Sequence, residues 1–433
     1  MRVTPLEDWI VNKSGIKARN PKLLEDYQLN QVRESLYYVK QNSRFYREKL
    51  SSVNENKINT WDDFNKISFT YPCHISRNPL EFLCVPLRDI KRIVTIRSSG
   101  TSGAEKRIYF TAADLELTVD FFKFGFKPMA AKTDRVLVLF PGSSYGSVGD
   151  VIQRALDLSG VENYVAGVMV NPDETANFII DNQINAIVGL PMQVLHLTRV
   201  HGEIFSHHIE KVLLSADYVP EVLIRELSSQ YGCQVFTHYG SSEMGYGGGV
   251  ECSAGNGYHL READIYFEII DPDTGKPVEA GQYGEIVFTT LTRQAMPLIR
   301  YRTGDIASFS TAQCDCGTFL RTMTRALGRA DNRADLGKKR FLYLRDLDET
   351  ILKFKEVLDY KAWVTDVNSL KVEIIAKNNS IRNEVEQSIQ TLWQQKLGGT
   401  MNFTVIVNTG GKPEKINNSM VKRKIQDFKG AGI

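Results

Sequence analysis

Residues 135–140, "RVLVLF", form the first of four short apolar runs that decide the expected fold. The other three are "INAIVGL" (184–190), "KVLLSA" (211–216) and "CQVFTHYG" (233–240). Segments with helical spacing separate these runs, for example "VPEVLIRELSSQYG" (219–232). Apolar strands that alternate with helices predict an α/β fold with a mainly parallel sheet, because both faces of such a sheet are covered.

The rest of the chain predicts three further parts. Residues 21–50 have the apolar spacing of an amphipathic helix, which can pack on the body of the protein or on a second subunit of a homodimer; its apolar positions are Leu29, Val32, Leu36 and Val39. After residue 263 a strand-turn-strand pattern predicts a smaller antiparallel or barrel-like section. We therefore expect a large N-terminal domain (residues 1–331) with mainly parallel sheets and a barrel-like section. A hinge joins it to a small α+β C-terminal domain (residues 332–433).

Composition narrows the classes of partner. The chain has 433 residues, is 42% hydrophobic and carries a formal net charge of +2, which gives no reason to expect nucleic acid or a membrane surface as the main partner. No apolar run reaches the roughly 18 residues of a membrane span, and the N-terminus lacks the apolar region of a signal peptide. We therefore expect a cytoplasmic protein whose six cysteines are reduced or bound to metal. Three of them are expected to be small buried apolar residues, namely Cys73, Cys84 and Cys233.

The stretch "RSSGTSGAEK" (97–106) is rich in hydroxyls and glycines and ends in a lysine. Glycines let backbone N–H groups approach an anion, and hydroxyls and lysine add donors and charge. The stretch is not a P-loop, because Glu105 stands where the second glycine must be and Arg107 where the hydroxyl must be. From these residues alone it is either a phosphate-binding loop or an ordinary mobile loop.

Three later stretches give the loop a context. They are "HYGSSEMG" (238–245), "IRYRTGDIA" (299–307) and "LGRADN" (327–332). In this order and spacing, the four elements resemble the adenylate-forming superfamily of acyl-CoA ligases. Residues 269–305 also resemble the phenylacetate–coenzyme A ligase branch of that superfamily.

The resemblance implies an ATP site. The loop would hold the triphosphate through Ser98, Ser99, Gly100, Thr101, Ser102, Gly103 and Lys106. Ser215, Ala216 and Asp217 would flank the adenine, and Tyr239 would stack on it. Gly240 and Ser241 would let the backbone pass close to the nucleotide. Catalysis would rest on Lys106, on Ser242 at the α-phosphate and on Glu243, which would hold Mg²⁺. Asp305 would bind the ribose, Arg329 the ribose or phosphate, and Asp331 would be the hinge between domains.

The resemblance also implies a two-step reaction. A carboxylic acid is activated with ATP as an acyl-adenylate and is then transferred to the thiol of coenzyme A. An enzyme that loads a carrier protein or an amine is the alternative. A third hypothesis is a nucleotide-binding protein without adenylation activity, because Met420 occupies the place of the family's C-terminal lysine. The neighbouring lysines that could replace it are Lys412, Lys415 and Lys422.

Four further residues have the types of a metal site. Cys252 and His259 are followed by Cys314 and Cys316, with Gly317 next in the chain. Three sulfurs and one imidazole nitrogen fit a closed tetrahedral Zn²⁺ site with a structural role, although four unrelated residues remain the alternative. A similar Cys-x-Cys-Gly turn in relatives of the phenylacetate–coenzyme A ligase branch supports zinc.

The resemblance places the acid near the strand ends. Residues there that could line an aryl-sized pocket are Tyr145, Met192, Phe236 and Tyr246. Aromatic residues at strand ends are also common in ordinary cores. The sequence therefore leaves the identity of the acid open, with an aryl acid such as phenylacetate as the expectation.

Overall fold

A computed structural model describes residues 3–97, 105–336, 340–366, 368–396, 398, 402–409, 423 and 425–427. It divides into two compact units. The first comprises Met1–Asp134, Pro141–Val165 and Phe236–Ala326, and the second comprises Arg135–Phe140, Ala166–Val235 and Leu327–Ile433. The expected domain boundary between residues 331 and 332 stays a prediction.

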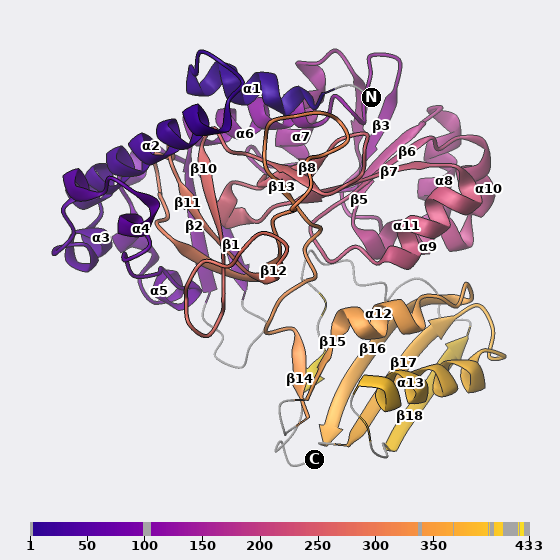
Figure 1. The fold of residues 1–433 in the computed structure, drawn as a ribbon. Helices are drawn as coiled ribbons and strands as arrows, with labels where there is room; N and C mark the ends of the chain where they lie inside the picture. The colour runs from indigo at the N-terminus through magenta and orange to yellow at the C-terminus, as the bar shows by residue number, and fades with distance from the viewer. Residues whose placement is uncertain are drawn as a thin grey trace. The chain divides into compact units, whose positions relative to one another are not determined.

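Most helices of the first unit belong to the N-terminal part of the chain (Figure 1). The α-helices are α1 (Pro5–Ser14), α2 (Pro21–Asn42), α3 (Arg44–Lys49), α4 (Trp61–Phe64), α5 (Pro72–Arg77), α6 (Ala112–Gly125) and α7 (Val148–Asp157). The short 3-10 helices are η1 (Glu55–Lys57), η2 (Pro79–Phe82), η3 (Leu87–Asp89) and η5 (Ser242–Met244). No helix among the described residues has both the length and the apolar character needed to cross a membrane.

The predicted N-terminal helix is confirmed as α2, with a second helix after it. Val32, Leu36 and Val39 are all fully buried, so the apolar stripe does face the body of this unit. The helix ends at Asn42 because Ser43 takes an extended conformation and its side chain accepts a hydrogen bond from Tyr46 N, which starts α3.

The paired strands of the first unit form two whole sheets and part of another. The strands β1 (Ile90–Arg97) and β2 (Glu105–Thr111) form an antiparallel pair. An antiparallel series follows in the order β13 (Thr322–Met323), β9 (Tyr258–Leu260), β8 (Gly249–Glu251) and β7 (Gln234–Tyr239), which enters the unit at Phe236. The short strand β4 (Glu162–Val165) lies after α7.

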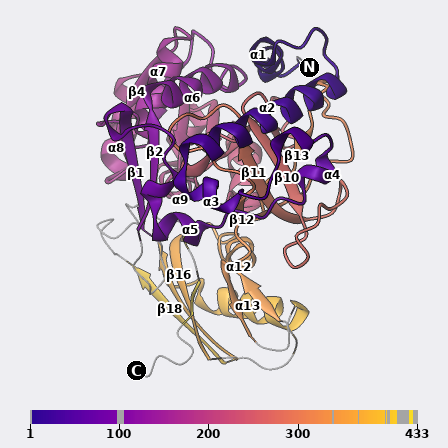
Figure 2. The ribbon, with the colours of Figure 1, turned by 90° about the vertical axis from the view of Figure 1, so that its left-hand side faces the viewer.

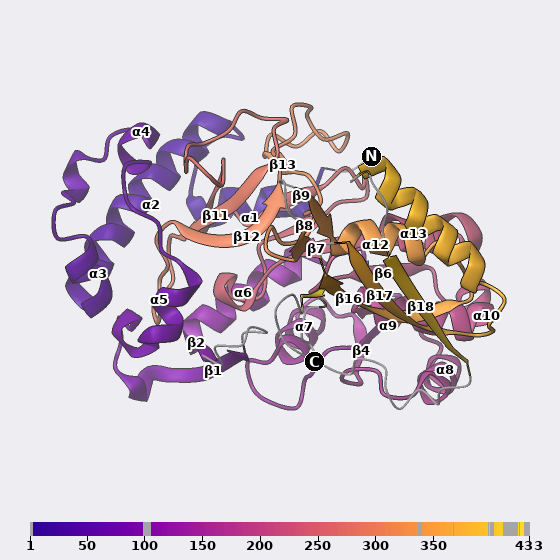
Figure 3. The same ribbon diagram turned by 90° about the horizontal axis from the view of Figure 1, so that it is seen from below.

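The third sheet confirms the antiparallel alternative for the section after residue 263 and not a closed barrel. Strands β10 (Ile265–Ile270), β11 (Gly284–Thr290) and β12 (Tyr301–Ala307) form an open antiparallel sheet, and the described residues contain no closed barrel. Figure 3 shows β11 and β12 side by side. Every residue of β10 and β11 is buried, which agrees with the apolar runs at residues 265–267 and 286–288.

The second unit contains the predicted parallel strands. Strands β3 (Arg135–Val138), β5 (Ala186–Gly189) and β6 (Lys211–Leu214) pair in parallel, with β5 in the middle. The helices between and after them are α8 (Pro172–Asp181), α9 (Pro191–Val200), α10 (Gly202–His207) and α11 (Glu221–Arg225), which continues as the π-helix η4 (Glu226–Gln230). The α/β prediction is therefore confirmed.

The C-terminal part of the second unit is α+β, as predicted. After the pair β14 (Arg333–Asp335) and β15 (Phe341–Tyr343), a four-stranded sheet has the order β18 (Asn402–Thr409), β17 (Ser369–Ala376), β16 (Val357–Asp366) and β19 (Gln426–Asp427). Helices α12 (Leu344–Ile351) and α13 (Arg382–Lys396) pack against each other beside this sheet (Figure 2). Their buried residues include Leu347, Ile351, Val385, Ile389 and Trp393.

The three cysteines outside the Cys/His set divide between core and surface. Cys84 and Cys233 are buried, as expected. Cys73 is exposed on α5, so the expectation of a buried Cys73 is wrong. In this helix of only six residues the buried position is Ile75, and the cysteine lies outside the apolar contact.

Candidate functional site

A short turn after β7 carries the acidic residue expected to bind metal. The strand ends at Tyr239 and the 3-10 helix η5 presents Glu243, with Ser241 capping the turn. Gly240 is required here, because a Cβ at this position would lie 1.9 Å from the Tyr246 carbonyl oxygen. Gly245 ends the turn at a φ of 73°, a left-handed conformation that favours glycine. The local sequence thus accounts for the shape of the turn.

Glu243 is buried, and its side chain is held by residues from two strands. Tyr301 of β12 donates a hydrogen bond to Glu243 Oε1 over 3.0 Å. Lys106 of β2 forms an ion pair with the same oxygen, and its Nζ lies 3.2 Å from the Tyr301 hydroxyl. Burial acts to raise the pKa of Glu243, but the Lys106 charge and these hydrogen bonds outweigh it and lower the pKa to about 2. Glu243 is therefore ionised at neutral pH.

This cluster agrees with the sequence prediction in part. Lys106 and Glu243, both predicted to be catalytic, are brought together, and Ser242 lies next to Glu243 on η5. Tyr301 was missed, although it stands inside the quoted stretch "IRYRTGDIA". A signal existed, because the phenol is four residues before Asp305, and residues an even number apart on a strand face the same side.

A second predicted pair also meets in the first unit. The Tyr239 hydroxyl donates a hydrogen bond to Asp305 Oδ2 over 3.0 Å, and both residues are buried. Burial and the Asp305 charge raise the pKa of Tyr239 well above its usual value. Asp305 itself is oriented by its backbone N–H, which donates to Thr303 Oγ1. The residues assigned to adenine and ribose are thus neighbours.

The remaining nucleotide residues lie in the second unit. Ser215 follows β6 and its N–H donates to Gly189 O over 3.1 Å. Ala216 has a φ of 72°, a strained conformation for a residue with a side chain. Asp217 Oδ2 lies 3.5 Å from Arg423 Nε. Arg329 forms an ion pair with Asp331 at 2.7 Å. Their proposed contacts with a nucleotide stay predictions.

Two sets of predicted residues lie outside the described part of the chain. One is the loop that would hold the triphosphate, Ser98, Ser99, Gly100, Thr101, Ser102 and Gly103. The other is the C-terminal set Lys412, Lys415, Met420 and Lys422.

The residues expected around the acid have different environments. Tyr246 is buried, stacks on Phe110 with ring centroids 5.6 Å apart, and donates a hydrogen bond to Gly146 O over 2.8 Å. Phe236 is fully buried, whereas Tyr145 is 48% exposed and lies against the Arg154 guanidinium. Met192, on α9, belongs to the second unit. An aryl pocket stays a prediction.

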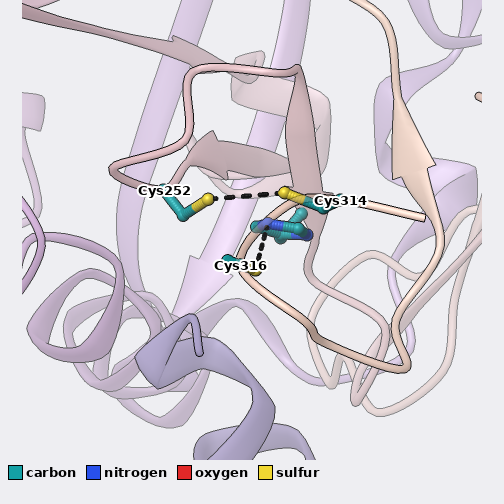
Figure 4. A group of neighbouring side chains, drawn as sticks. Cys252, Cys314 and Cys316 are labelled. Atoms are coloured by element: carbon teal, nitrogen blue, oxygen red, sulfur yellow. Dashed lines mark hydrogen bonds between the residues drawn. The ribbon is translucent and has the colours of Figure 1, made fainter. Parts of the chain in front are cut away.

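The predicted metal ligands converge inside the first unit. Cys252 follows β8, His259 lies on β9, and Cys314 and Cys316 lie on the loop between β12 and β13. Their ligand atoms all lie within 4.8 Å of one another, and all four residues are buried. Figure 4 shows the three cysteine side chains pointing toward one another. Gly317 closes the Cys314–Cys316 turn at a φ of 81°.

The spacing of these atoms is that of a tetrahedral site. Cys252 Sγ and Cys314 Sγ are 3.7 Å apart, and Cys316 Sγ lies 3.6 Å from His259 Nε2. A tetrahedron with Zn–S bonds of about 2.3 Å has edges of about 3.8 Å. His259 Nδ1 is buried and has no hydrogen-bond partner in the described structure. Burial raises the pKa of Cys252 to about 12. For Cys316, burial is outweighed by hydrogen bonds from His259 and backbone amides, which lower the pKa to about 6.

A family model described as "AMP-binding enzyme" matches residues 52–292, more than half of the chain. This chain belongs to the AMP-binding enzyme family. The predicted resemblance to adenylate-forming enzymes is thereby confirmed.

Curated relatives of this AMP-binding enzyme support the narrower branch. A phenylacetate-coenzyme A ligase of Thermus thermophilus is 26% identical over 374 residues, which cover 81% of each chain. A phenylacetate-coenzyme A ligase of Escherichia coli is 25% identical over 428 residues, or 90% of this chain and 92% of the relative.

Solved structures agree on the fold of this AMP-binding enzyme. A 2-hydroxyisobutyryl-CoA ligase in the postadenylation state matches with a TM-score of 0.78 at 17% identity, covering 93% of this chain and 89% of that chain. An anthranilate CoA ligase in complex with anthranoyl-AMP matches with a TM-score of 0.53 at 16% identity, covering 74% and 64% of the two chains.

Proposed function

We propose that this AMP-binding enzyme is an ATP-dependent acid–thiol ligase that converts a carboxylic acid into its coenzyme A thioester through an acyl-adenylate. The observation that carries the proposal is the buried, ionised Glu243 held by Lys106 and Tyr301. The pair Tyr239 and Asp305, in the same unit, supplies an aromatic face and a carboxylate suited to a nucleoside. Relatives named phenylacetate-coenzyme A ligase favour an aryl acid.

In the first step a carboxylate oxygen attacks the α-phosphorus of ATP, and the bond to the pyrophosphate oxygen breaks. In the second step the coenzyme A thiol loses its proton and attacks the acyl carbonyl, and AMP leaves. Lys106 and Ser242 would neutralise and orient the phosphoryl oxygens. Asp305 would accept hydrogen bonds from ribose hydroxyls, so that the nucleotide is held in one orientation while bonds change.

Glu243 fits a Mg²⁺ ligand. Among the described residues, its side-chain partners Lys106 and Tyr301 both bond to Oε1, so Oε2 would be the oxygen offered to a cation. A hard cation with few protein ligands prefers one or two carboxylates plus phosphate oxygens. The ion would neutralise the polyphosphate charge when bound.

The buried Cys/His set fits Zn²⁺ better than it fits a plain core. Three sulfurs and a nitrogen leave no position open for water, so the role would be structural. The ligands join the β8–β9 hairpin, which follows the Glu243 turn, to the loop after β12, which carries Asp305. Glu7 of α1 supports that loop by accepting hydrogen bonds from Thr318 Oγ1 and Phe319 N.

The test is pyrophosphate release from ATP and Mg²⁺ over a panel of aryl and aliphatic acids, with and without coenzyme A. The proposal expects release with at least one acid, and a thioester only when coenzyme A is present. Release without thioester formation would favour transfer to a carrier protein or an amine.

Met420 favours a second candidate, a nucleotide-binding protein that does not adenylate. The side chain of methionine cannot supply the positive charge that the family takes from a lysine at this place. This candidate expects ATP or AMP to bind while no acid in the panel releases pyrophosphate.

A further inference from the structure

Arg293 is a buried cation that none of the assignments above uses. It lies three residues after the end of β11, on the loop that leads to β12, and is only 9% exposed. No Asp or Glu oxygen in the described chain lies within ion-pair distance of its guanidinium, whereas Arg261 and Arg300 in the same unit pair with Asp264 and Glu268. Burying a charge without a paired carboxylate is costly, so a specific gain must offset it.

The guanidinium of Arg293 is directed at the Glu243 turn. Its Nη1 donates a hydrogen bond to the Glu243 carbonyl oxygen. Its Nη2 lies 2.6 Å from the point that a Cβ on Gly245 would occupy, so the absence of a side chain at Gly245 makes room for the arginine. The plane rests on Phe110, with Cζ 5.3 Å from the ring centroid.

A second side chain, Thr118, holds the turn at Gly245. Thr118 Oγ1 donates a hydrogen bond to Gly245 O over 2.9 Å and itself accepts one from Arg261 Nη1 over 3.2 Å. Arg293 and Thr118 therefore hold the backbone of the turn, while Lys106 and Tyr301 hold its carboxylate. Of these four side chains, only Arg293 and Thr118 bond to the backbone of the turn.

We propose that Arg293 is a positioning residue, which holds the Glu243 turn so that the Glu243 carboxylate meets the Mg²⁺ of the bound nucleotide. The inference rests on the proposed function, because it assigns Glu243 to the metal. Arg293 touches no substrate in this role. Its charge also offsets the negative charge that the metal–nucleotide complex brings to the turn.

The experiment measures pyrophosphate release against free Mg²⁺ for the parent protein, Arg293→Met and Arg293→Lys. We expect both variants to raise the Mg²⁺ concentration for half-maximal rate about tenfold and to lower the maximal rate roughly 100-fold, as a displacement of about 1 Å does. The KM for the acid should stay within about twofold, because the acid is not a partner of the arginine. Arg293→Lys should not restore the Mg²⁺ dependence or the rate of the parent protein. One ammonium cannot both reach the Glu243 carbonyl and lie over Phe110, as the planar guanidinium does.

The control is Arg321→Met, which removes another arginine stacked on a ring, with Cζ 4.4 Å from the Phe309 centroid, and leaves Glu262 unpaired. It should lower the Tm without moving the Mg²⁺ dependence, as a merely structural lesion does. Gly245→Ala should resemble Arg293→Met, and the double variant should lose less than the sum of the two, because both changes break one contact. An unchanged Mg²⁺ dependence in Arg293→Met would overturn the inference.

A second measurement distinguishes a failure of the proposed ligase function from a failure of the inference about Arg293. If no acid gives pyrophosphate, calorimetric titration of ATP at several Mg²⁺ concentrations replaces the rate as the readout. A parent that needs less Mg²⁺ for ATP binding than Arg293→Met supports the inference while the ligase assignment falls. Equal Mg²⁺ dependence, or no ATP binding by the parent, overturns the inference.

Discussion

The ion pair between Lys106 and Glu243 makes a quantitative prediction. Glu243→Gln leaves the Lys106 ammonium in a place where its side chain is 15% exposed, and Lys106→Met leaves a carboxylate that is 9% exposed. The fall in the pKa of Glu243 from 4.5 to about 2 corresponds to about 3 kcal/mol of preference for the charged form, at about 1.4 kcal/mol per pKa unit. We therefore expect a coupling energy of about 2–3 kcal/mol in the free energy of unfolding, with the double variant more stable than the two single losses imply.

The assay is urea unfolding at pH 7 of the parent protein, Glu243→Gln, Lys106→Met and the double variant. The chain has four tryptophans, of which Trp9 and Trp61 lie in the first unit and Trp363 and Trp393 in the second. A background with Trp363→Phe and Trp393→Phe makes fluorescence report on the unit that holds the ion pair. This separation matters because a chain with two units need not unfold in one step.

The pH dependence has a definite sign. The pKa of Glu243 is lower in the folded protein, so its stabilisation is fully present above about 4.5 and is lost as the pH falls toward about 2. The coupling should therefore shrink across that range. A coupling below about 0.5 kcal/mol at pH 7, or one that does not change between pH 7 and pH 3, would refute the electrostatic reasoning. The double variant should regain stability without regaining pyrophosphate release.

Three further outcomes are expected. Protein purified without chelator should carry about one equivalent of zinc by elemental analysis. Cys316→Ser should lose the zinc and several degrees of Tm, because metal binding and folding are linked. A parent that carries no zinc and has the same Tm as Cys316→Ser would contradict this. Met420→Lys should raise the rate of pyrophosphate release at least tenfold, since one positioned donor is worth about 10²–10³ in rate; an unchanged rate would place the needed charge elsewhere. Asp305→Asn should raise the KM for ATP more than the KM for the acid, and Tyr239→Phe should do so less; equal effects on both substrates would count against a ribose contact.

The fold could be predicted from the sequence where burial is two-sided. The run at 184–190 becomes β5, in the middle of three parallel strands, with Ala186, Ile187 and Val188 fully buried. A strand covered on both faces must be continuously apolar, so the pattern is direct evidence. The barrel-like expectation failed because a strand-turn-strand pattern gives antiparallel pairing but not closure, which depends on shear and strand number.

Only those site residues that lie in a short sequence motif could be predicted from the sequence. Glu243 and Asp305 were assigned from a resemblance carried by two short motifs, and the four Cys/His residues from their types and spacing. The structure places Glu243 beside Lys106, Asp305 beside Tyr239, and the four Cys/His residues together, while their roles stay predictions. Tyr301 and Arg293 were not singled out from the sequence, because their contacts depend on how β12 and the loop before it lie against the Glu243 turn. The register β11 to β12, which includes a bulge near Val287, decides this and is not readable from composition. Lys106 was found but given only the phosphate as a partner.

The presence of Met420 in the place of the family's lysine should affect the rates of the two half-reactions differently. In the first, negative charge develops on the phosphoryl group as pyrophosphate leaves, and the family's lysine would meet that charge. In the second, the bond that breaks joins the acyl carbon to AMP, and the charge that must be stabilised lies largely on the carbonyl oxygen. The described residues around Glu243 include the cations Lys106 and Arg293, whose contacts with the Glu243 turn do not involve Met420. In the proposed site these contacts would serve binding of the metal–nucleotide complex with either residue at position 420. A missing lysine should therefore slow adenylation while leaving nucleotide binding and thioester formation from a supplied acyl-adenylate largely intact.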